Sequence, residues 1–107
     1  MNKAELEEIF ADLGPISIKR LFGGKGVYFR GLIVAIDWGD ELLLKADALS
    51  APTFEAAGAS RWSYQNKTGK RVAMPYWSTP VDALDDPEIM LGWLKLAYDA
   101  ALRAQIT

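Results

Sequence analysis

The sequence contains no cysteine and no histidine. These two absences exclude disulfides, thiolate metal sites, cysteine nucleophiles and every catalytic arrangement that depends on an imidazole. Residues 1–5 lack the apolar core of a signal peptide. The longest apolar run, residues 32–36, is far shorter than the roughly 20 residues of a membrane-spanning helix. We therefore expect a cytoplasmic protein that does not enter a membrane.

The remaining composition suits one folded domain. Half of the 107 residues are hydrophobic and 24% are charged, as in an average globular domain. A chain of this length is the usual size of one domain. We predict a single domain over residues 1–107 with its own hydrophobic core.

Helical spacing of apolar residues predicts a helix near each end of the chain. These apolar stripes are Leu6, Ile9, Phe10 and Leu13 in the first helix, and Ile89, Met90, Trp93, Leu94 and Ala97 in the last. Asn2 and Glu5 have the spacing of a capping box ahead of the first helix, and Asp86 is placed to cap the last. Ser50 and Gly58 bound a short helix between them.

Alternating polarity and short apolar runs predict strands between these helices. The expected strands cover residues 16–21, 27–29, 32–36, 41–45, 61–65 and 70–77. Successive strands are joined by tight turns, so the sheet should be mainly antiparallel. The predicted fold class is α+β, with helices packed on the sheet in the order α-β-β-β(-β)-α-β-β-α.

Side-chain patterns also predict where individual strands lie. Residues 32–36 are apolar at every position, which indicates a central strand covered on both sides. Pro75 cannot donate a hydrogen bond to a neighbouring strand, so residues 70–77 should lie at an edge or carry a bulge. Trp62 and Tyr64 share one face of their strand, and we expect that face to meet the helices.

Three glycines interrupt the strands after residue 21. Gly23 and Gly24 precede Lys25, but Gly26 and a strand follow, where a phosphate-binding Walker loop needs Ser or Thr and a helix. A dinucleotide-binding loop also needs a helix at this point. We interpret Gly23, Gly24 and Gly26 as a structural turn that needs positive φ or close backbone approach.

Acidic residues form two clusters, at residues 5–8 and residues 82–88. The first group lies on the solvated face of the first helix, and the second surrounds the start of the last helix, where negative charge is favoured. Neither group has the spacing of a calcium-binding EF-hand loop. We interpret both groups as structural and expect neither a metal nor a cofactor.

The basic residues are more informative, because residues 16–30 and residues 59–81 contain no acid. Together these two stretches hold eight of the twelve Lys and Arg residues. If they meet, they form a basic patch with aromatic neighbours that binds an acidic protein segment or nucleic-acid phosphates. The alternative is that these residues are solvated and the aromatic residues form the core. The candidate partner-binding residues are Lys19, Arg20, Lys25, Lys70 and Arg71 as steering charges, with Trp38 and Trp77 as exposed anchors.

Several short segments together resemble one protein family. The segment KRLFGGKGVY at residues 19–28 is similar to the signature of the TfoX/Sxy N-terminal domain. Further matches follow in order: residues 42–47, residues 54–58, Tyr64 before a Lys/Gly hairpin, residues 74–77, and Asp86-Pro87. The resemblance implies a fold related to type III secretion chaperones and a link to regulation of natural competence. It offers no catalytic residues. Full-length members carry a second, helical domain, and we expect this chain to be a stand-alone N-terminal domain.

These observations favour a non-enzymatic regulatory domain that binds a protein partner. Direct nucleic-acid binding through the basic patch and small-molecule binding between sheet and helices remain alternatives. A homodimer is a further option, because an edge strand and exposed aromatic side chains both favour self-association.

Overall fold

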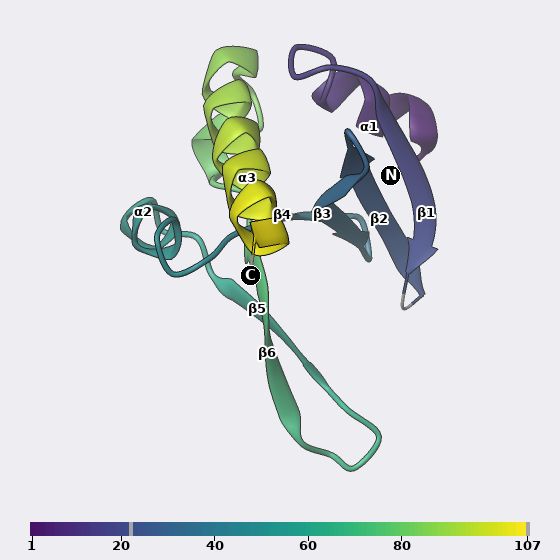
Figure 1. The fold of residues 1–107 in the computed structure, drawn as a ribbon, viewed down its shortest axis with the longest axis vertical. Coiled ribbons are helices and arrows are strands. Elements are labelled where there is room, and N and C mark those ends of the chain that lie inside the picture. The colour runs from purple at the N-terminus through teal and green to yellow at the C-terminus, as the bar shows by residue number, and fades with distance from the viewer. Residues whose placement is uncertain (22, 107) are drawn as a thin grey trace.

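The computed structural model describes residues 1–21 and 23–106. Phe22, part of the signature segment, lies outside the described residues. The helices are α1 (Lys3–Ile9), α2 (Ala51–Ala56), a short 3-10 helix η1 (Val81–Ala83) and α3 (Pro87–Ile106). The strands are β1 (Ile16–Leu21), β2 (Gly24–Phe29), β3 (Leu32–Trp38), β4 (Glu41–Lys45), β5 (Arg61–Gln65) and β6 (Arg71–Ser78). This order confirms the predicted α+β fold (Figure 1).

Local sequence signals explain where the helices begin and end. The Asn2 side chain accepts a hydrogen bond from the Glu5 amide, and the Glu5 side chain accepts one from the Asn2 amide, which confirms the capping box. Gly58 has a φ of 83° after α2, as a C-terminal capping glycine should. No helix among the described residues is long and apolar enough to cross a bilayer.

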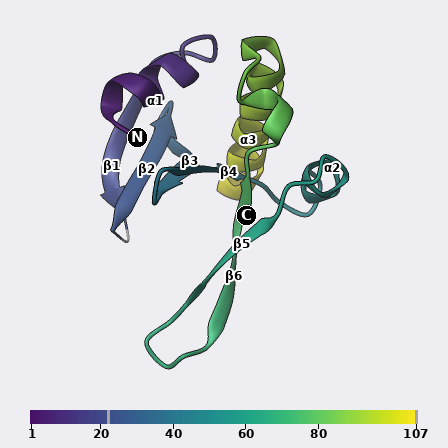
Figure 2. The same ribbon diagram turned by 180° about the vertical axis from the view of Figure 1, so that it is seen from behind.

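The six strands form one antiparallel sheet in the order β1-β2-β3-β4-β6-β5. The prediction that the Pro75 strand lies at an edge is therefore wrong, because β6 is flanked by β4 and β5. The alternative of a bulge is confirmed: the β5–β6 register shifts between Arg61 and Ser63, opposite Pro75. β6 meets β4 only over Tyr76–Ser78, so the β5–β6 hairpin projects beyond the other strands as an arm (Figures 1 and 2).

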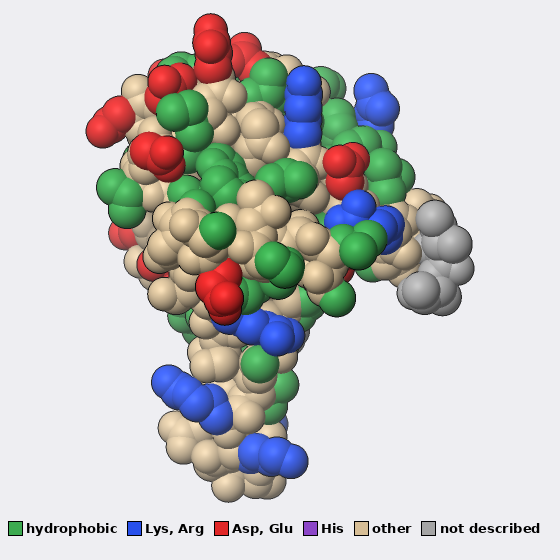
Figure 3. Space-filling model, turned by 90° about the vertical axis from the view of Figure 1, so that its left-hand side faces the viewer, with side chains coloured by type: hydrophobic (Ala, Val, Ile, Leu, Met, Phe, Trp, Pro, Cys, Tyr) green, Lys and Arg blue, Asp and Glu red, His purple; other side chains and the backbone are tan. Residues whose placement is uncertain are grey.

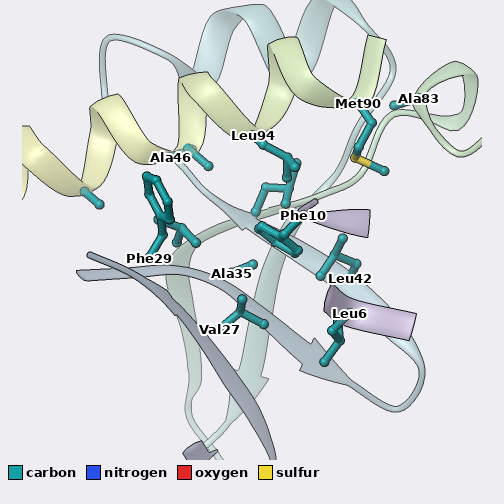
Figure 4. Packing of buried hydrophobic residues seen from close by; sticks show 14 of the residues in the cluster. Leu6, Phe10, Val27, Phe29, Ala35, Leu42, Ala46, Ala83, Met90 and Leu94 are labelled. Carbon is teal, nitrogen blue, oxygen red and sulfur yellow. The ribbon is translucent and has the colours of Figure 1, made fainter. Parts of the chain in front are cut away.

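One face of the sheet carries the helices and the main core. Leu6 of α1, Phe10 directly after it, Phe54 of α2 and Leu94 of α3 are buried against strand residues such as Val27. Figure 4 shows Phe10 and Leu94 meeting between α3 and the strands. The apolar stripes predicted for α1 and α3 account for this packing, except that Ile89 is exposed because it lies beside the stripe.

The opposite face has no helix among the described residues, which corrects two expectations. β3 is central, as predicted, but its second side is covered by side chains of its own sheet, where Ile36 packs against Leu43 and Tyr76. Trp62 belongs to this cluster and contacts Tyr64, so both rings face away from the helices. Alternation showed that they share a face, but it did not show which face the helices cover.

The glycine segment divides between a turn and a strand. Gly23 has a φ of 84° and forms the turn between β1 and β2, as predicted. Gly24 and Gly26 belong to β2 instead. A Cβ on Gly24 would lie 2.5 Å from the Asp37 carbonyl oxygen, so close backbone approach is the reason for this glycine.

Candidate functional site

The sheet face without helices carries a connected group of aromatic rings. Trp62 lies at its centre, with ring centroids 5.2 Å from Trp38, 5.8 Å from Tyr64 and 6.5 Å from Tyr76. Tyr28 pairs with Ile33 on the same face. We call this surface the aromatic face; it consists of Leu21, Tyr28, Ile33, Ile36, Trp38, Leu43, Trp62, Tyr64, Met74 and Tyr76. Of these rings only Tyr76 is buried, so the other four remain partly accessible.

Two lysines lie over rings of the aromatic face. The Lys19 Nζ is 5.0 Å from the Tyr28 ring centroid, and the Lys45 Nζ is 5.2 Å from that of Tyr76. Burial lowers the pKa of Lys45 from its usual range, with Asp47 opposing that shift. Burial, with a smaller electrostatic contribution from Tyr28, raises the pKa of Tyr76 to about 12.

Two arginines of the hairpin arm border the same face. Arg61, Trp62 and Arg71 line a shallow cleft of about 280 Å³ together with Glu41, its one acidic lining residue among those described. The Arg61 Nε donates a hydrogen bond of 2.9 Å to the Met74 carbonyl, which fixes this arginine at the bulge. The border of the aromatic face is therefore mainly cationic.

A second cleft, of about 500 Å³, lies between the β1–β2 turn and the β3–β4 turn. Arg20, Lys25 and Asp37 line it. The Met1 ammonium is 3.1 Å from Asp37 Oδ2 and also contacts Asp40, and these carboxylates raise the pKa of that ammonium. Asp37 was not predicted as a site residue: its side chain is 5% exposed, and its Oδ1 has no hydrogen-bond partner among the described residues.

The structure separates the residues that were predicted to form one patch. Lys19 and Trp38 lie on the aromatic face. Arg20 and Lys25 line the cleft on the other side of β1 and β2. Lys70 and Arg71 lie on the arm. Lys19 and Arg20 separate because adjacent residues of a strand point to opposite faces. The two acid-free stretches thus border a common region without forming one continuous patch.

The expectation that Trp38 and Trp77 are the exposed anchors is only partly met. Trp38 is half-buried in β3, where its ring meets Trp62, and it remains on the accessible aromatic face. Trp77 is half-buried on the helix side, with its ring centroid 6.3 Å from Phe54. Its place next to buried Tyr76 in β6 directs it to the helices, so Trp77 is not an anchor on the aromatic face.

The described residues include no group of three or more Asp, Glu, Cys or His side chains that could hold a metal ion. The TfoX N-terminal domain family model matches residues 8–101, which is most of the chain. This match confirms the resemblance carried by the segment at residues 19–28. No curated protein matches the sequence.

Proposed function

Because the chain belongs to the TfoX N-terminal domain family, we propose that it is a non-enzymatic regulatory domain, linked to natural competence, that binds an acidic, extended segment of a protein partner. The family match supports a regulatory, competence-related role, and the family is not known for enzymatic activity. The observation that carries the proposed mechanism is the aromatic face, which no helix covers and which cations border.

The charges on this face favour an acidic partner. Lys19, Lys45, Arg61 and Arg71 lie on or beside it, with Glu41 as the acidic neighbour. Complementary charge speeds association and selects the partner, while partly exposed Trp and Tyr side chains supply most of the binding energy at typical interfaces. An acidic segment with apolar side chains fits both features.

The hairpin arm favours an extended partner. Since β4 pairs with β6 only as far as Tyr76, residues 71–74 of β6 have no strand beside them on the β4 side among the described residues. Extended peptides add to such open edges through backbone hydrogen bonds, and their alternate side chains contact the adjoining face. A strand added here would lie next to the aromatic face.

The test uses a fluorescein-labelled, 12-residue peptide of alternating Glu and Val, with a Lys/Val peptide as its counterpart. Fluorescence anisotropy should show binding of the acidic peptide only. The double variant Lys19→Glu, Arg71→Glu should weaken that binding at least tenfold. The matched double variant Lys3→Glu, Lys95→Glu has the same net charge, but its changes lie on α1 and α3, and it should bind as the wild type does. Equal affinity of both double variants for the acidic peptide would contradict the proposal.

Single-stranded nucleic acid is the second candidate, because rings beside cations on a sheet face also stack bases. A labelled 20-nucleotide oligothymidine titrated at low salt distinguishes the two. Binding that weakens steeply with salt and is lost when Trp38 is replaced by Ala would favour nucleic acid over the acidic peptide. No binding at micromolar protein concentration would remove this candidate.

A further inference from the structure

A groove at the other end of the molecule lies between α1 and the start of α3 and encloses about 360 Å³. Its floor is apolar: Ile9 is half-buried, while Ala83 and Met90 are buried. Four acidic side chains, all exposed, also line the groove: Glu5, Glu8, Asp12 and Asp85. Lys and Arg are absent from the lining residues, so the groove combines an apolar floor with a rim of one charge.

The acidity of this end extends along both chain segments that build it. Residues 4–18 and residues 72–94 contain no Lys or Arg. The ion pairs formed among the described residues use Asp37, Asp40 and Asp47, so none of the groove's acids is neutralised by a cation. Acidic side chains gather at the upper end in Figure 3, where α3 begins in Figure 1, and Lys and Arg lie on the arm at the lower end.

Helix capping explains some of these acids but not all. Asp86 accepts hydrogen bonds from the Glu88 and Ile89 amides and so caps α3, and Glu5 belongs to the capping box of α1. Glu8, however, lies in the last turn of α1 and Asp12 follows it. Negative charge is unfavourable at the C-terminal end of a helix. Helix capping and the helix dipole therefore do not explain Glu8 and Asp12.

Apolar side chains beside the groove are exposed as well. Leu84, which lines it, is 58% exposed, and Val81 of η1 is 81% exposed. Large apolar side chains next to a groove mark sites of protein contact more often than isolated ones do. The surface offers apolar contact and negative charge to the same partner.

We propose that this groove binds a cationic amphipathic helix of a partner protein. Its walls are α1 and the η1–α3 connection. None of the described strands contributes a lining residue, so among the described residues an extended segment finds no backbone edge to pair with here. An amphipathic helix places its apolar stripe on the floor formed by Ile9 and Met90 and its Lys or Arg side chains against the rim. This inference does not rest on the proposed function, because it uses the opposite end of the molecule.

The probe is a fluorescein-labelled, 18-residue peptide of Leu and Lys in helical spacing. Its counterpart has the same composition in strict alternation, which favours a strand. Anisotropy should show micromolar binding of the helical peptide and at least tenfold weaker binding of the alternating one. The double variant Glu8→Lys, Asp12→Lys should lose at least tenfold in affinity for the helical peptide. It places cations at the C-terminal end of α1, so its Tm should not fall.

The control variant Glu55→Lys, Asp99→Lys changes net charge equally at exposed sites in α2 and α3 and should bind normally. Equal binding of both peptides, or equal weakening by both variants, would show simple charge attraction and overturn the inference. Sedimentation equilibrium at low salt tests a second copy as the occupant. If the wild type forms a dimer and the Glu8→Lys, Asp12→Lys variant does not, the occupant of the groove is a second copy of this chain. That result would overturn the proposal of a partner helix.

Discussion

The two faces of the sheet differ in how their apolar side chains are covered. On the helix side, each of the helices α1, α2 and α3 contributes a buried side chain, namely Leu6, Phe54 and Leu94. On the aromatic face, only Ile36, Leu43 and Tyr76 are buried, and the remaining rings cover them while staying partly accessible. The first arrangement stabilises the fold through burial of area. The second leaves aromatic surface that the fold does not use.

This difference implies that a substitution should affect the two faces in different ways. A change on the helix side removes buried contacts and lowers the free energy of unfolding. A change at the border of the aromatic face alters accessible charge and ring surface, which contribute little to the free energy of unfolding. The four predictions below test this contrast, beginning with the largest expected effect.

Phe10→Ala should lower the free energy of unfolding by about 3–5 kcal/mol, because it leaves a cavity among fully buried side chains. Urea denaturation followed by tryptophan fluorescence measures the change. Trp38→Ala on the aromatic face should cost less, since its ring is only half-buried. An equal loss from both substitutions would show that the aromatic face is a second core.

Gly24→Ala and Gly26→Ala extend the contrast to two glycines of one strand. A Cβ on Gly24 meets the Asp37 carbonyl oxygen, which is backbone, and should cost about 1–3 kcal/mol through displacement of β3. A Cβ on Gly26 meets the ends of the Tyr28 and Ile33 side chains on the aromatic face. These can move, so its cost should be smaller. Thermal unfolding of the two variants, measured under the same conditions, shows which substitution lowers the Tm more.

The sequence predicted the elements and much of the pairing, because these depend on short-range signals. The Asn2 cap, the Gly58 helix end and the turn at Gly23 follow from local backbone chemistry. It did not predict which side the helices cover. Alternation of polar and apolar residues is the same whichever of its two faces a strand turns toward the helices, so Trp62 was assigned to the wrong side of the sheet. Asp37 was missed because its surroundings depend on Met1 and the β1–β2 turn, both far away in the sequence, lying next to β3.

The Asp47–Arg103 ion pair provides a pH-dependent test on the helix side. Two hydrogen bonds from Arg103 hold the pKa of Asp47 well below its usual range, with burial opposing the shift and Ser50 assisting it. A depressed carboxyl pKa contributes stability above the unfolded value of about 4, and that contribution is lost as pH falls further. Arg103→Gln should therefore lower the Tm at pH 7, and its difference from wild type should shrink toward pH 2.

The matched control for that experiment is Lys95→Gln, which removes one exposed positive charge from the same helix. Its Tm difference from wild type should be small and should not follow the titration of Asp47. If both variants gave the same pH profile, net charge would explain the result and the ion pair would contribute nothing specific.

The smallest expected effect on stability belongs to the substitutions that matter most for binding. Lys19 and Arg71 are exposed, and Lys19 contributes about 0.5–1 kcal/mol at most through its position over Tyr28. Lys19→Glu, Arg71→Glu should thus shift the urea midpoint only slightly while it weakens binding of the acidic peptide. Because the fold does not depend on these charges, a loss of binding cannot be attributed to unfolding. A midpoint shift as large as that of Phe10→Ala would place these residues in the structural framework and remove the distinction between the two faces.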